Sequence, residues 1–179
     1  MISKRTLLAS MGALVCVGTR PARAKLPVIP AAQHEKAMRL AIEEGRRNPF
    51  FPFGAVIVRA ATGEVTARGV NNTRANPTLH GEIACMNDHV ARNGNTGWPD
   101  LVLYTTAEPC PMCMSALCWA RIGGVVFGTS IDGLKRVGID QIDIASRAVV
   151  AAAPFFEGTL LGGVLQDETD RLFRERRRN

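Results

Sequence analysis

The apolar and polar positions of the chain follow a helical period first and a strand period next. Apolar residues recur at spacings of three and four over residues 31–47, which predicts an amphipathic helix. The prolines of segment 47–52 end this helix, because a residue that precedes proline avoids the helical conformation. Apolar runs then cover 53–58 and 64–70, on either side of the Thr62-Gly63 turn. These two runs predict a β-hairpin.

Helices and strands are predicted to alternate after the hairpin. We expect helices at 79–92, 110–121, about 144–153 and from 167 onward, and strands at 101–105, 124–128 and, more weakly, 160–165. Such alternation is typical of an α/β protein with helices on both faces of a sheet. The hairpin makes that sheet mixed. The sequence therefore predicts a three-layer α-β-α sandwich with a central mixed five-stranded sheet.

The first 24 residues differ from the rest of the chain. Lys4 and Arg5 precede an apolar stretch, and Ala22-Arg23-Ala24 has the small-x-small pattern of a signal-peptidase site. We expect a signal peptide over 1–24 and one domain over 25–179. The Lys4-Arg5 pair resembles a twin-arginine export signal in which Lys replaces the first Arg. A plain secretory signal and an amphipathic anchor are the alternatives.

The predicted signal peptide indicates export to the periplasm. If residues 1–24 do not act as a signal peptide, a cytoplasmic location is expected. No apolar run reaches the roughly 18 residues of a membrane-spanning helix.

The formal net charge is +6, from 22 basic and 16 acidic residues. Residues 1–24 hold four basic and no acidic residues, so 18 basic and 16 acidic residues leave +2. Much of the excess lies in the arginines over 171–178, which we interpret as a solvated helix end, so nucleic-acid binding is not expected.

Two short motifs carry the candidate chemistry. His80-Gly81-Glu82 and Pro109-Cys110-Pro111-Met112-Cys113 each lie near the start of a predicted helix. Together they match the H-x-E and P-C-x-x-C signature of zinc-dependent nucleobase deaminases. His80, Cys110 and Cys113 would bind the zinc ion and leave the open position of a catalytic site. A spacing of three places both thiolates on one side of a helical first turn, whose dipole stabilises them.

Glu82 is the candidate catalytic residue. Zinc lowers the pKa of its bound water from about 15.7 to roughly 7, which supplies hydroxide at neutral pH. A carboxylate beside it can take a proton from this water and return protons to a ring nitrogen and to the departing ammonia. We therefore expect Glu82 to be shielded from solvent, with a raised pKa.

Two other interpretations of the cysteines compete. The C-x-x-C pair is also typical of redox proteins, although this leaves His80 and Glu82 unexplained. A structural zinc site would need a fourth ligand such as Cys85 or Cys118, and both are expected to be small core residues. His34 and His89 are not expected to be ligands.

Residues 53–128 resemble the cytidine deaminase superfamily, and among its members bacterial guanine deaminases. The resemblance rests on Pro-Phe-Gly-Ala-Val-Ile-Val at 52–58, Asn71-Asn72, Asn-Pro-Thr-Leu-His-Gly-Glu at 76–82, Glu-Pro-Cys-Pro-Met-Cys at 108–113 and Trp-Ala-Arg at 119–121. Leu-Tyr-Thr-Thr at 103–106 is similar to fungal cytosine deaminases. Most relatives carry Ala at the position of Gly81.

The resemblance implies substrate contacts and a homodimer. The residues that it places at the substrate are Asn71, Phe53 and the backbone near Ala107 and Glu108. It also implies an aspartate whose position falls by length on Gly133, and a shift of one residue would assign this role to Asp132. The arginine-rich end does not match the aromatic-rich ends of guanine deaminases, so the C-terminal residues do not identify which base is the substrate.

The sequence favours deamination of a free nucleobase or nucleoside, and of guanine to xanthine in particular. The alternatives are cytosine, another heterocycle, or the adenosine of a tRNA, which export and the modest charge disfavour. A structural-zinc or C-x-x-C redox protein ranks last. The expected partner is a small molecule.

Overall fold

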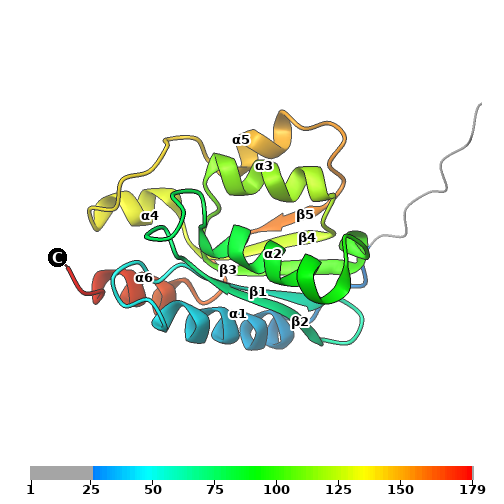
Figure 1. Ribbon diagram of the computed structural model, residues 1–179, viewed down its shortest axis with the longest axis horizontal. Helices are drawn as coiled ribbons and strands as arrows, with labels where there is room; N and C mark the ends of the chain where they lie inside the picture. The colour runs from blue at the N-terminus through cyan, green and yellow to red at the C-terminus, as the bar shows by residue number, and fades with distance from the viewer. Residues whose placement is uncertain (1–25, 179) are drawn as a thin grey trace, which may run out of the picture.

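The structure, a computed structural model, describes residues 26–178 (Figure 1). The predicted signal peptide over 1–24 lies outside the described residues and stays a prediction. Between residues 26 and 178, none of the helices has the length and apolar character needed to cross a membrane.

A single mixed sheet forms the middle layer, in the order β2-β1-β3-β4-β5. Its strands are β1 (Gly54–Arg59), β2 (Val65–Val70), β3 (Leu101–Ala107), β4 (Gly124–Thr129) and β5 (Thr159–Leu161). Strand β1 is antiparallel to both β2 and β3, whereas β3, β4 and β5 are parallel. The predicted mixed five-stranded sheet is confirmed.

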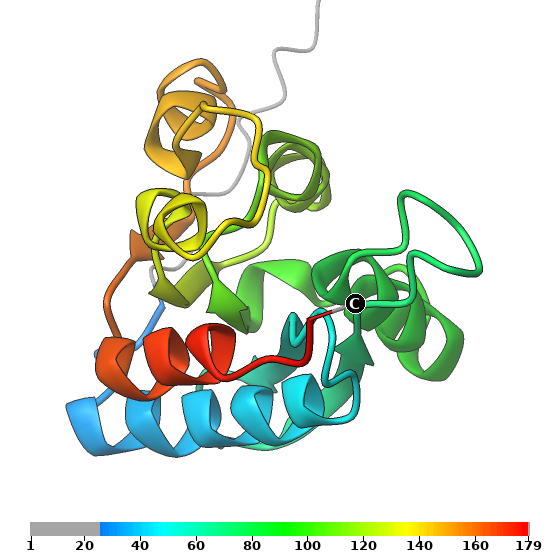
Figure 2. The same ribbon diagram turned by 90° about the vertical axis from the view of Figure 1, so that its left-hand side faces the viewer.

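Helices cover both faces of the sheet, which completes the three layers (Figures 1 and 2). One layer holds α1 (Ala31–Arg46) and α6 (Gln166–Arg174), and the other holds α2 (Gly81–Asn93), α3 (Pro111–Ala120) and α5 (Ser146–Ala151). A short helix, α4 (Ile131–Arg136), follows the carboxyl end of β4, and a 3-10 turn (Trp98–Asp100) precedes β3.

Strand β1 shows how the two cores form. Successive side chains of a strand point to opposite faces of the sheet. Ala55 and Ile57 therefore join the core beneath α2 and α3, while Val56 and Val58 join the core beneath α1. Because β1 is buried on both faces, it reads as a continuous apolar run in the sequence.

The second half of the chain departs from the predicted element bounds. Helix α4 was not predicted, and it begins because the Ser130 hydroxyl accepts a hydrogen bond from the Gly133 N–H at 3.1 Å. Strand β5 ends at Leu161 rather than at residue 165. Gly163 (φ +82°) and Leu165 (φ +52°) have left-handed backbone conformations that turn the chain into α6.

Candidate zinc centre and active site

The candidate site lies where α2 and α3 begin side by side. His80 and Cys110 are the N-cap residues of these helices, and both have extended backbones (φ −67° and −61°). Cys110 follows closely on the carboxyl end of β3. Open α/β sheets commonly bind ligands outside the carboxyl ends of their strands. The fold therefore brings the two sequence motifs together at one end of the sheet.

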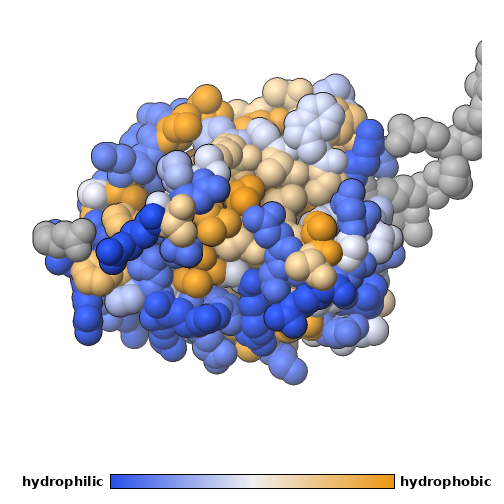
Figure 3. Space-filling model, in the orientation of Figure 1, coloured by the Kyte–Doolittle hydropathy of each residue, from blue (hydrophilic) through white to orange (hydrophobic). Residues whose placement is uncertain are grey.

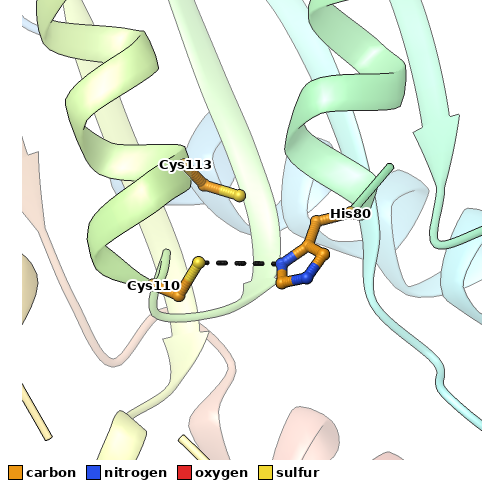
Figure 4. Close-up of side chains that lie close together, drawn as sticks. All are labelled: His80, Cys110 and Cys113. Atoms are coloured by element: carbon orange, nitrogen blue, oxygen red, sulfur yellow. Dashed lines mark hydrogen bonds between the residues drawn. The ribbon is translucent and has the colours of Figure 1, made fainter. Parts of the chain in front are cut away.

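The three predicted metal ligands converge (Figure 4). The His80 Nδ1 atom lies 3.6 Å from the Cys110 Sγ atom, and the ligand atoms of His80, Cys110 and Cys113 all lie within 4.8 Å of one another. Tetrahedral zinc, with bonds of about 2.3 Å to sulfur and about 2.0 Å to nitrogen, separates its ligand atoms by about 3.6 Å. The donor set and its spacing therefore fit a zinc ion.

The electrostatics of the two thiols also suit a divalent cation. A hydrogen bond from the Cys113 thiol lowers the pKa of Cys110 to about 4, and a hydrogen bond with His80 acts in the same direction. The neighbouring Cys110 in turn raises the pKa of Cys113, and burial adds to this effect. The first of the two thiols therefore loses its proton readily, and a bound cation would favour loss of the proton from the second.

Glu82 lies in the first turn of α2, and its side chain faces the cavity described below. The residue is only 3% exposed, and its Oε1 atom accepts a hydrogen bond of 3.1 Å from the Thr105 hydroxyl. Burial raises the pKa of the Glu82 carboxyl, because the charged form loses its hydration. A carboxyl shifted toward neutrality can both take and release a proton, as the predicted role requires.

A cavity of about 180 Å³ opens beside the metal ligands. Its walls are formed by residues from several loops and helix starts, namely Phe51, Phe53, Asn71, Thr73, His80, Glu82, Glu108, Cys110, Ile139, Asp140 and Gln141. Pockets for drug-sized ligands are larger, roughly 300–1,000 Å³. The cavity therefore suits a single heterocyclic ring system. A hollow of about 730 Å³ elsewhere, between Leu26 and Leu161, contains none of the predicted site residues.

Asn71 and Phe53, two of the predicted substrate contacts, lie at this cavity. The Asn71 side-chain N–H donates to the Thr73 hydroxyl at 3.2 Å, and its backbone carbonyl accepts from the Asn48 amide at 2.9 Å. The Phe53 ring packs against Phe173, with 4.9 Å between the centroids. Both side chains are held in place beside the cavity, and their contact with substrate stays a prediction.

Glu108 stabilises the loops that surround the cavity. Its carboxylate accepts hydrogen bonds from the backbone N–H groups of Ile131 (3.0 Å) and Ser146 (2.8 Å), where α4 and α5 begin. It thereby fixes the loops around the cavity that it also lines. Ala107 is fully buried in an apolar cluster with Phe173, so its side chain is part of the core.

The structure does not bring Asp132 to the cavity. Its side chain is 77% exposed on α4 and lies 4.0 Å from the Lys135 ammonium group. The aspartate at the cavity wall is Asp140, with Gln141 beside it. Both follow the loop turn at Gly138 (φ +74°), and no motif in the sequence marks them. Asp132 therefore lies away from this cavity, and its contact with substrate stays a prediction.

The geometry does not support a structural zinc site with a fourth cysteine ligand. Cys85 and Cys118 are buried in the core beneath α2 and α3. Within the described range, neither belongs to the group of side chains that could hold a metal. The three-ligand arrangement therefore has no fourth cysteine.

Known proteins share these features. The family described as the cytidine and deoxycytidylate deaminase zinc-binding region matches residues 31–129. Guanine deaminase of Bacillus subtilis (strain 168) is 34% identical over 132 residues, which span 70% of this chain and 83% of that protein. A solved structure of NE0047 in complex with 2,6-diaminopurine has a TM-score of 0.69 and 26% identity, and the match covers 83% of this chain and 82% of that one.

A further relative acts on RNA. The tRNA-specific adenosine deaminase of Streptococcus pyogenes serotype M1 is 34% identical over 102 residues, or 56% of this chain. The match spans 57% of that protein, so this chain covers little more than half of its length.

Replacement of Glu82 tests its role as proton carrier. In Glu82→Gln the amide cannot accept and return a proton, so we expect ammonia release from nucleobases to fall by roughly 10²–10⁴-fold. Zinc content, measured by mass spectrometry of the metal, should stay at the wild-type level, because Glu82 is not a ligand. The exposed Glu43 offers a matched control, Glu43→Gln. Retention of more than half of the turnover in Glu82→Gln would rule out the role.

Proposed function

The chain belongs to the cytidine and deoxycytidylate deaminase family and is a zinc-dependent nucleobase deaminase, and on this premise we propose that guanine is the base it converts to xanthine. In that reaction water adds to ring carbon C2, the bond from C2 to the exocyclic nitrogen breaks, and ammonia leaves. The observation that carries the proposal is the ring-sized cavity lined by Glu82 and by His80 and Cys110, two of the three residues of the metal-binding group.

The polar groups of the cavity support a purine with ring N–H donors. The Asn71 amide oxygen accepts no hydrogen bond from the described residues, and the Asp140 carboxylate forms no ion pair with them. Both oxygens can accept from ring N–H groups, which guanine carries in its imidazole and pyrimidine rings. Phe53 supplies an aromatic wall for the ring.

Different residues of this chain bind the metal, transfer protons and orient the proton carrier. His80, Cys110 and Cys113 would hold zinc, which when bound supplies a Lewis acid that lowers the pKa of water. The Glu82 carboxylate takes one proton from the attacking water and passes it to a ring nitrogen, and it then takes the second proton of that water and delivers it to the departing amine. The Thr105 hydroxyl keeps Glu82 oriented. The buried position of Glu82 excludes bulk water from these transfers.

The tRNA adenosine deaminase relation gives a second candidate function. That match spans less of this chain than the match to guanine deaminase, 56% against 70%. We therefore rank guanine first and include tRNA in the test.

Ammonia release by the purified, zinc-loaded protein tests the choice of base. We expect release from guanine, with xanthine formed in equal amount, and little from cytosine, adenine, their nucleosides or tRNA. Coupled ammonia detection and chromatography of the products measure both. Glu82→Gln serves as the blank. Turnover of cytosine or tRNA in place of guanine would contradict the proposal while leaving the chemistry intact.

We also propose that the protein is a homodimer that associates through α2 and α3. Helix α3 carries no charged residue, and Trp119 on it is 75% exposed and stacked on Phe155 with 4.7 Å between ring centroids. On α2, Val90 is 42% exposed. Figure 3 shows apolar surface gathered over these two helices. Exposed apolar patches of this kind are typical of interfaces.

Light scattering after size-exclusion chromatography tests the dimer. The expected mass is twice that of one chain. Trp119→Glu places a charge in the proposed interface, so it should shift the protein toward monomer. Val28→Glu changes a residue that is 97% exposed and distant in sequence, and it should leave the dimer intact. A wild-type monomer at micromolar concentration would refute the proposal.

Finally, we propose that residues 1–24 direct export. The basic start, the apolar stretch and the Ala22-Arg23-Ala24 site support this. In a Gram-negative host, the mature chain should appear in the periplasmic fraction with Lys25 as its first residue, which N-terminal sequencing detects. An uncleaved chain confined to the cytoplasmic fraction would contradict it.

A further inference from the structure

Two hollows meet at the mouth of the active site. The base cavity of about 180 Å³ adjoins a hollow of about 490 Å³, and the two share Phe51, Ile139 and Asp140 as wall residues. A free base fits the smaller space, whereas a nucleoside also carries a sugar that needs room beyond it. Pockets that bury larger ligands measure roughly 300–1,000 Å³. The residues between the two hollows therefore determine whether a sugar can extend from the base cavity.

Two loops form the partition between these hollows. Ile139 is 8% exposed and belongs to the apolar cluster of Phe173, so the core holds it in place. Asp140 follows it on the same loop. Phe51 comes from the loop after α1 and is 44% exposed. Because Phe51 has the largest side chain of the three shared residues, its ring is the main barrier between the two spaces.

Hydrogen bonds hold the loop that carries Phe51. The side-chain oxygen of Asn48 accepts from the Phe51 N–H at 3.0 Å, and the side-chain N–H of Asn48 donates to the Asn71 carbonyl at 2.9 Å. Asn48 thereby fixes Phe51 relative to the polar wall of the cavity. The Arg177 N–H donates to the Pro49 carbonyl at 2.8 Å, so the loop is also tied to the segment after α6 (Figure 2). The barrier therefore stands on a braced loop.

We propose that Phe51 is a specificity-determining residue that admits a free base and excludes the corresponding nucleoside. The inference rests on the proposed function, because it concerns the form in which the base enters the same site. A sugar attached to a ring in the base cavity would collide with the Phe51 ring before it reached the larger hollow. Clashes built against a competing ligand are a general source of specificity. The sequence motifs do not include Phe51, and its place between the hollows gives it this role.

Calorimetry on the zinc-loaded Glu82→Gln protein tests the proposal without turnover. Guanine, cytosine and adenine are each compared with their own nucleoside. For the base that the cavity accepts, we expect the nucleoside to bind at least roughly tenfold more weakly than the base. Adding Phe51→Ala should reduce this difference by roughly tenfold, because removal of the ring joins the two hollows and relieves the clash.

Phe50→Ala is the matched control. Phe50 precedes Phe51 on the same loop, its N–H donates to the same Asn48 oxygen at 3.2 Å, and it is 39% exposed. Of the two hollows, Phe50 lines only the larger one. Phe50→Ala should therefore leave the difference between base and nucleoside unchanged. Phe51→Leu keeps an apolar side chain and should give an intermediate difference, which provides the test if Phe51→Ala does not fold.

The outcomes separate this inference from the proposed function. A wild-type cavity that binds a nucleoside as tightly as its base overturns the inference, whether or not guanine is deaminated. An unchanged difference in both Phe51 variants, or an equal change in Phe50→Ala, also overturns it and leaves guanine deamination intact. A difference that Phe51→Ala removes for cytosine and cytidine, without turnover of guanine, supports the inference and contradicts guanine as the base.

Discussion

The approach of two helix N-termini is the constraint on which the active site depends. His80 caps α2 and Cys110 caps α3, so the ligand atoms meet within 4.8 Å only if both helices begin at the same end of the sheet. The positive ends of both helix dipoles then favour the thiolates and the Glu82 carboxylate in one small volume. Zinc binding and proton transfer thus share one geometric origin.

Direct backbone contact holds α2 in this position. A Cβ atom at Gly81 would lie 2.4 Å from the Phe53 carbonyl oxygen, and one at Gly69 would lie 2.2 Å from the Cys85 nitrogen, so a side chain at either position would require α2 to move away from the sheet. The same Phe53 carbonyl accepts a hydrogen bond from the Asn71 N–H at 2.9 Å. One carbonyl group therefore sets the start of the helix, the aromatic wall and the polar wall of the cavity relative to one another.

The sequence predicts the parts of the molecule that local rules determine. Periodicity predicts β1 and its hairpin because β1 is buried on both faces, and the two motifs identify His80, Glu82, Cys110 and Cys113 because the chemistry needs those residue types at that spacing. The path from 130 to 146 could not be predicted, because hydrogen bonds from distant residues fix it. Glu108 holds Ile131 and Ser146, and Arg176 holds Val137 and Gly138. Asp132 therefore lies away from the cavity that Asp140 lines.

The residues that carry out the reaction and the residues that could select the substrate lie on different parts of the fold. The groups that activate water stand on helices whose positions the sheet determines, so the reaction class follows from the motifs. Other groups that line the cavity, Phe51, Asp140 and Gln141, lie on loops that the segment after α6 holds together. Changes in that segment alter the mouth of the cavity and leave the zinc ligands in place. Selection acting on the end of the chain can therefore change which nucleobase derivative enters without altering how its amine is removed.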